Sequence, residues 1–163
     1  MRYFLACLLT LSLCVLPARG AEGVTRGQFV LLLWQANGGV PFDKTAHPFT
    51  DISDDGTAQA AAWAYEEGLV QGVGDGLFAP DRPLTRQEQA LLLRRNDARL
   101  GLEEWGGDGA AACNDWAEVS PWMDDSLYRA CVTGRLPWRQ GRLAPQSPVT
   151  AEEAYASLAP WLP

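Results

Sequence analysis

Apolar residues recur at helical spacing in three stretches of the chain. In the first stretch they occupy the i, i+3, i+4 and i+7 positions that place side chains on one face of a helix. These residues are Phe29, Leu32, Leu33 and Ala36. The matching stretches lie at residues 90–93 and 154–158. The pattern predicts three helices, each with one face turned toward a core.

The same capping motif precedes each predicted helix. An apolar residue is followed by Thr-x-x-Gln or Thr-x-x-Glu, with the threonines at positions 25, 85 and 150. In such a capping box the threonine hydroxyl accepts a hydrogen bond from the amide of the third helical residue. The side chain of that third residue reaches back to the threonine amide. The motif therefore predicts that the helices begin directly after Thr25, Thr85 and Thr150.

The similarity between the second and third copies extends upstream of their capping boxes. Residues 49–52 (Phe-Thr-Asp-Ile) parallel residues 116–119 (Trp-Ala-Glu-Val). A short amphipathic segment, a glycine-rich turn and a proline follow in each copy. The chain is therefore expected to contain an internal repeat, built from a short helix, a turn, a brief extended piece and a capped helix.

The second copy resembles the S-layer homology domain nearly position for position. The resemblance rests on Phe49-Thr50-Asp51-Ile52, Trp63-Ala64, Gly68-Leu69-Val70-Gln71-Gly72, Gly74-Asp75-Gly76-Leu77-Phe78-Ala79-Pro80-Asp81 and Leu84-Thr85-Arg86-Gln87-Glu88. It implies a mainly α fold, in which helix–loop–helix repeats pack as a pseudo-threefold helical prism with short extended pieces in the loops. It also implies that grooves between the repeats bind secondary cell wall polysaccharide of bacteria, often in pyruvylated form.

The resemblance divides the chain into five segments. These are a signal peptide at 1–20, a partial repeat with only its second helix at 21–45, a repeat at 46–98, a glycine-rich linker at 99–113 and a divergent repeat at 114–163. The first segment has a basic start, an apolar run and small residues before Ala21, as secretory signals do. A retained membrane anchor and a lipoprotein site at Cys14 are the alternatives. We expect a small stand-alone secreted protein of the bacterial cell surface or wall.

Charge and cysteine content narrow the function further. The 163 residues carry 13 Lys and Arg against 20 Asp and Glu, a net charge of −7. Loss of Arg2 and Arg19 with the signal peptide makes the charge −9. Such a field repels a phosphate backbone, so nucleic acid is not an expected partner, and no membrane contact is expected after signal cleavage.

Cys113 and Cys131 are the two cysteines that remain after signal cleavage, either as a disulfide in an oxidising compartment or as two buried thiols.

The resemblance also implies a carbohydrate site. Arg26 and Arg86 would bind the carboxylate of a pyruvyl ketal, because a planar guanidinium next to a helix N-terminus suits that group. Thr25, Gln28, Thr85 and Glu88 would shape the helix mouth. Gly74, Asp75 and Gly76 would let the backbone approach a sugar, and Trp63 or Trp138 would stack on one.

Each of these residues also has a purely structural interpretation. The threonines and their Gln or Glu partners could serve only as helix caps, the arginines could pair with nearby acids, and Trp63 could belong to the core. No motif points to catalysis, a cofactor or a metal, and the one histidine, His47, lies in a polar connector. The rival function is a protein-interaction scaffold that has lost glycan binding, with another surface protein or a second copy as its partner.

Overall fold

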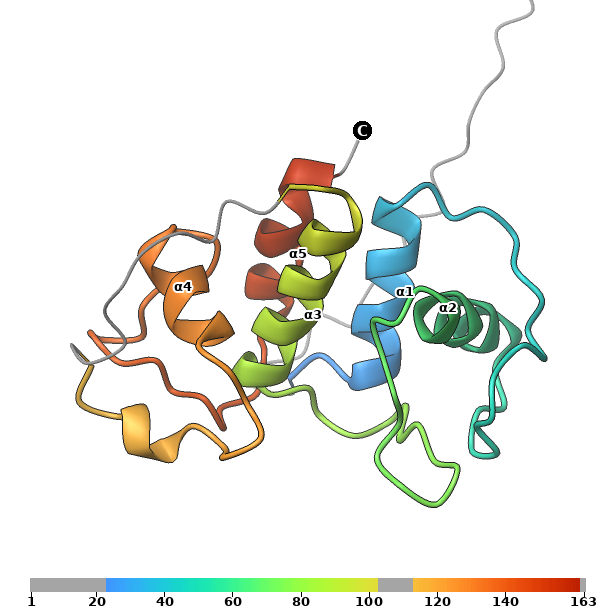
Figure 1. The fold of residues 1–163 in the computed structure, drawn as a ribbon, viewed down its shortest axis with the longest axis horizontal. Coiled ribbons are helices and arrows are strands. Elements are labelled where there is room, and N and C mark those ends of the chain that lie inside the picture. The colour runs from blue at the N-terminus through green and yellow to red at the C-terminus, as the bar shows by residue number, and fades with distance from the viewer. Residues whose placement is uncertain (1–22, 103–112, 162–163) are drawn as a thin grey trace, which may run out of the picture.

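The computed structural model describes residues 23–102 and 113–161, and these residues are mainly α-helical (Figure 1). The elements are α1 (Arg26–Ala36), α2 (Asp55–Glu66), α3 (Arg86–Arg99), α4 (Ser126–Val132) and α5 (Ala151–Leu158), with 3-10 turns η2 (Trp116–Glu118) and η3 (Ala159–Trp161). Within the described ranges the only β-type pairing is in isolated bridges. The predicted mainly α class is confirmed. The predicted signal peptide and most of the predicted linker lie outside the described residues.

The three predicted capping boxes are confirmed. Helices α1, α3 and α5 begin directly after Thr25, Thr85 and Thr150, and both hydrogen bonds of the box are present in each. Figure 1 shows these three helices in the middle of the molecule, with α2 on one side and α4 on the other. Each capped helix therefore serves as the inner helix of its copy.

A ring of backbone hydrogen bonds joins the starts of the three inner helices. The amide of Val24 donates to the carbonyl of Val149 (2.8 Å), that of Val149 donates to Leu84 (2.9 Å), and that of Leu84 donates back to Val24 (2.9 Å). All three side chains are buried. The starts of the three inner helices are thus arranged around this ring, as a pseudo-threefold prism requires.

The loops before α3 and α5 each dock on the N-terminus of another inner helix. The amides of Arg26 and Gly27, at the start of α1, donate to the carbonyls of Arg82 and Pro80 at 2.9 and 2.8 Å. The amides of Arg86 and Gln87, at the start of α3, donate in the same way to Ser147 and Pro145. Docking therefore satisfies the orphan amides of both helix starts with protein carbonyls.

A buried or half-buried aspartate holds each docking loop in shape. The carboxylate of Asp51 accepts hydrogen bonds from the amides of Phe78 and Ala79 at 2.8 and 2.7 Å. Asp115 does the same for the amides of Leu143 and Ala144 at 3.0 and 2.7 Å. The counterpart of Asp51 is therefore Asp115. The alignment of Asp51 with Glu118 made from the sequence was wrong, because the similar motif lies inside the segment between Asp115 and α4. That segment, residues 116–125, is seven residues longer than the one between Asp51 and α2, and we call it the insertion.

We expect Asp115→Asn to lower the free energy of unfolding at neutral pH. We also expect the free energy of unfolding to change less with pH in the acid range than it does in the unmodified protein. Burial raises the pKa of Asp115, but the two amides and the charge of Arg142 outweigh it and bring the pKa below the ordinary 3.8. A carboxylate of this kind stabilises the fold fully above pH 3.8 and loses that contribution as the pH falls further. An asparagine has one acceptor oxygen for two amides, so the free energy of unfolding at pH 7 should fall by about 2 kcal/mol.

Urea denaturation at pH 7 and pH 3 measures both effects. Asp75→Asn is the matched control, because Asp75 is exposed and its positive φ of 50° suits asparagine. Equal unfolding curves for the Asp115 and Asp75 variants would contradict the role given to Asp115.

Candidate functional site

An open groove of about 740 Å³ lies where the second copy meets the start of α1 and the insertion before α4. Residues of α1, α3, the loop after α2 and the segment before α4 line it: Arg26, Leu69, Val70, Gln71, Gly72, Val73, Arg82, Glu88, Leu91, Leu92, Arg95, Trp122 and Asp124. We call this space the open groove. Its wall combines apolar side chains with a few charged groups, as ligand sites commonly do.

Arg26 is the most deeply placed cation of the open groove. Only 7% of its surface is exposed. Its Nε donates to the carbonyl of Phe78 at 3.0 Å, and its guanidinium lies 4.8 Å from the centre of the Phe78 ring. Among the described residues, nothing accepts a hydrogen bond from its two terminal nitrogens. Burial lowers the pKa of Arg26, and Glu88 partly offsets this effect; an arginine nevertheless stays charged at neutral pH.

Glu88 is held by a second arginine instead of by Arg26. Arg82 binds both carboxylate oxygens, at 3.2 and 2.5 Å, and Glu88 also accepts from the amide of Thr85. Burial raises the pKa of Glu88, but these partners outweigh it and lower the pKa. Arg95 donates to the carbonyl of Leu69 at 2.8 Å. With three arginines against Glu88 and Asp124, the open groove carries a net positive charge in an acidic chain.

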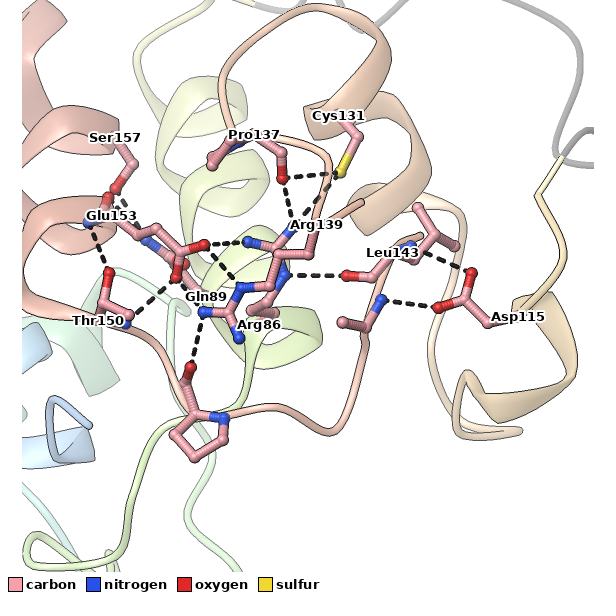
Figure 2. A network of polar contacts seen from close by, with 12 residues as sticks. Arg86, Gln89, Asp115, Cys131, Pro137, Arg139, Leu143, Thr150, Glu153 and Ser157 are labelled. Atoms are coloured by element: carbon pink, nitrogen blue, oxygen red, sulfur yellow. Dashed lines mark hydrogen bonds and ion pairs between the residues drawn. The ribbon is translucent and has the colours of Figure 1, made fainter. Parts of the chain in front are cut away.

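The equivalent position at the start of α3 is closed (Figure 2). Arg86 has no exposed surface. Its guanidinium donates to Glu153 at 2.5 Å, to the carbonyl of Leu143 at 2.9 Å and to the carbonyl of Pro137 at 2.6 Å. Arg139 binds Glu153 as well. Arg86 therefore pairs with a nearby acid, which is the structural interpretation considered for it, and in this structure no outside carboxylate reaches it.

Loop length explains why one position is open and the other closed. Gly68 follows α2 and Gly134 follows α4, and both glycines have a positive φ. Gly76 and Gly141 occupy equivalent positions in the turn that comes next. Seven residues separate Gly68 from Gly76 in the second copy, whereas six separate Gly134 from Gly141 in the third. The shorter loop brings the carbonyl of Pro137 onto Arg86. In the longer loop Gly72 lines the open groove, where a Cβ would lie 2.7 Å from the carbonyl oxygen of Leu77.

The structure brings two of the ten predicted site residues together in the open groove, Arg26 and Glu88. The helix caps Thr25, Gln28 and Thr85 are not among its lining residues, and neither are Gly74, Asp75 and Gly76, which form an exposed turn. Trp63 is 8% exposed in the core, with Arg99 5.4 Å from its ring centre. Trp138 packs edge-on against Tyr128 at 6.1 Å. Of the two predicted arginines, Arg26 lines the open groove and Arg86 does not.

Among the lining residues that sequence reasoning missed, three are cationic or aromatic side chains that could contact a ligand: Arg82, Arg95 and Trp122. The two arginines come from a loop and from the middle of α3, and the chain pattern alone gives no sign that they face Arg26. Trp122 belongs to the insertion that the third copy carries between Asp115 and α4. Its 63% exposure is unusual for a residue of this size. The sequence feature that could have pointed to Trp122 is a tryptophan next to a proline in a polar connector.

Of the two cysteines considered for a disulfide, Cys113 is half-buried and Cys131 is buried. Burial raises the pKa of Cys131 to about 11, so it is a thiol at neutral pH.

The described residues contain no group of three or more His, Cys, Asp or Glu side chains suited to a metal ion. In the same part of the chain, every helix is too short or too polar to cross a membrane.

The described helices form a helical repeat module with an open groove, and comparison with known proteins assigns its second repeat. Residues 48–90, which span α2, the following loop and the start of α3, match the S-layer homology domain. The resemblance stated from the sequence is thus confirmed over this segment. The match of residues 48–90 to the S-layer homology domain indicates association with the cell surface.

Two relatives share this similarity. An endoglucanase of Bacillus sp. (strain KSM-635) is 31% identical over 111 residues, which cover 68% of this chain and 12% of the endoglucanase. A cell surface protein of Thermoanaerobacter kivui is 40% identical over 58 residues, which cover 35% of this chain and 7% of that protein. The chain therefore spans only a small part of the length of either relative.

Because the position of Arg86 is closed, we expect two equivalent glutamates, Glu153 and Glu88, to contribute very different amounts to the free energy of unfolding. Glu153→Gln should cost about 3 kcal/mol or more, because it leaves the fully buried Arg86 without its counter-charge. Glu88→Gln should cost less than about 1 kcal/mol, because Arg82, its partner, is partly exposed and can turn to water. Glutamine keeps the capping box in both variants, as Gln28 does naturally.

Urea denaturation of the two variants measures this difference. Similar losses of stability would contradict the idea that only one of the two positions is a sealed ion pair.

Proposed function

We propose that this protein is a non-catalytic module that attaches to the bacterial cell wall by binding secondary cell wall polysaccharide in the open groove. The bound unit carries a pyruvyl ketal, whose carboxylate pairs with Arg26. The module acts outside the cell, after removal of residues 1–20. The observation that supports this proposal is a buried guanidinium that faces a groove with both terminal nitrogens unoccupied among the described residues.

The ligand group follows from the geometry of Arg26. Its Nε is fixed by the carbonyl of Phe78, so the guanidinium plane is held in place before a ligand arrives. The two remaining nitrogens present a planar pair of donors, which fits a carboxylate in bidentate fashion. The first two amides of α1 are occupied by loop carbonyls. The arginine fork, rather than the helix N-terminus itself, is therefore the anion-binding element.

The charge around Arg26 favours the same ligand. Glu88 is neutralised by Arg82, so it does not compete for Arg26. Trp122 and the apolar side chains of the groove can meet the C–H faces of a sugar, while the arginine meets its acidic substituent. An anionic polymer is thus attracted locally, although the chain as a whole is acidic.

The proposal gives different roles to the two equivalent arginines, Arg26 and Arg86. At the start of α3 the carboxylate of Glu153 occupies the guanidinium that a ligand would need. The carboxylate of Glu153 already makes with Arg86 the interaction that a pyruvyl carboxylate would make with Arg26. The proposal therefore assigns glycan binding to Arg26 and a stabilising role to Arg86.

Binding to isolated wall sacculi tests the proposal. The purified protein should sediment with sacculi that carry their secondary polymer and stay in solution after that polymer has been extracted. Arg26→Gln should weaken sedimentation at least about tenfold, the loss typical of a central binding residue. Arg142→Gln is the control, because it removes the same charge from a half-exposed site outside the open groove.

Two outcomes would contradict the proposal. Equal binding before and after polymer extraction would point to a surface protein or another wall component as the partner. Equal weakening by the Arg26 and Arg142 variants would point to general electrostatic attraction instead of a defined groove.

A further inference from the structure

We infer that Trp122 is a sugar-stacking platform, so that the ligand of the open groove is recognised through the C–H face of a pyranose ring as well as through its carboxylate. The inference rests on the proposed function and adds a residue that the repeat itself does not supply. Trp122 lines the same groove as Arg26 and is 63% exposed. It comes from the segment between Asp115 and α4, which is seven residues longer than the segment between Asp51 and α2, mainly because α4 is shorter than α2 and begins later.

The insertion is fixed to α3 on the N-terminal side of Trp122. The side chain of Gln87, which is buried, donates to the hydroxyl of Ser120 at 2.8 Å and accepts from the amide of Ser120 at 3.1 Å. The amide of Met123 donates to the carbonyl of Ser120 at 2.9 Å, which closes a turn around Trp122. Pro121 further restricts the backbone before it.

The insertion is fixed to α3 on the C-terminal side of Trp122 as well. Arg94 donates to Asp124 at 3.1 Å and to Asp125 at 2.9 Å. Gln87 and Arg94 are seven residues apart on α3, so they lie two turns apart on one face of the helix. The backbone that carries Trp122 is thus held at both ends before any ligand binds.

A rigidly supported and exposed tryptophan points to a partner that covers it. Leaving an indole in water forgoes the free energy of burying its large apolar surface. Within the described residues, no other aromatic ring stacks on Trp122. Arg26 in the same groove supplies the polar anchor, and a pyranose with an acidic substituent is the ligand class that offers both an apolar ring face and a carboxylate. Preordering lowers the entropy cost of placing the ring against the sugar.

Sacculi that carry the secondary polymer are the probe, and the affinity of four variants is compared with that of the unmodified protein. Trp122→Ala should weaken binding about tenfold or more, whereas Trp122→Phe should retain most of it because it keeps a ring face. Trp138→Ala removes a partly exposed tryptophan that does not line the groove and should leave binding unchanged. Arg26→Gln reports separately on the carboxylate contact. Thermal unfolding by circular dichroism checks that each variant is folded.

The outcomes separate this inference from the proposed function. Loss of binding in Arg26→Gln with full binding in Trp122→Ala would overturn the platform and leave the groove function standing. Loss of binding in Trp122→Phe equal to that in Trp122→Ala would also overturn it, since a specific indole contact would then replace ring stacking. If the unmodified protein binds extracted sacculi as well as intact ones, the proposed function and this inference fall together.

Discussion

Three backbone hydrogen bonds, which link Val24, Leu84 and Val149 in a closed ring, set the geometry on which the rest of the structure depends. Each of these residues immediately precedes a capped inner helix, so the ring fixes where all three helices begin. Because the helix starts are fixed, the loops before α3 and α5 must pass over the N-termini of neighbouring helices. The open groove and the closed position both lie at that crossing.

The same scaffold gives opposite results at its two arginines. Arg26 and Arg86 are each the first residue of an inner helix, and in each the Nε donates to a carbonyl of the docking loop. A loop that is one residue shorter brings the carbonyl of Pro137 against Arg86, and Glu153 supplies a counter-charge. The longer loop leaves Arg26 facing a groove. A small change in chain length thus decides whether a buried cation stabilises the fold or is available to a ligand.

The open groove shows how an acidic protein can present a local cationic site. Glu88 is near Arg26, yet it is held by Arg82 and by the capping box at Thr85. The insertion of the third copy adds Trp122 at the edge of the same groove. One copy therefore supplies the arginine, a second supplies most of the wall, and the third supplies an aromatic side chain, so the site exists only in the assembled prism.

Local patterns in the sequence were enough to predict the inner helices and the internal repeat. The three Thr-x-x-Gln/Glu boxes predicted the starts of α1, α3 and α5 correctly, because a capping box is a local interaction within four residues. The tertiary structure decided which arginine faces a groove, because that depends on where a loop from a different copy places its carbonyls. It also showed that Asp115, and not Glu118, matches Asp51, since the two are defined by the distant amides they hold. Local hydrogen bonds can be inferred from neighbouring residues, whereas contacts between copies are fixed only when the ring closes.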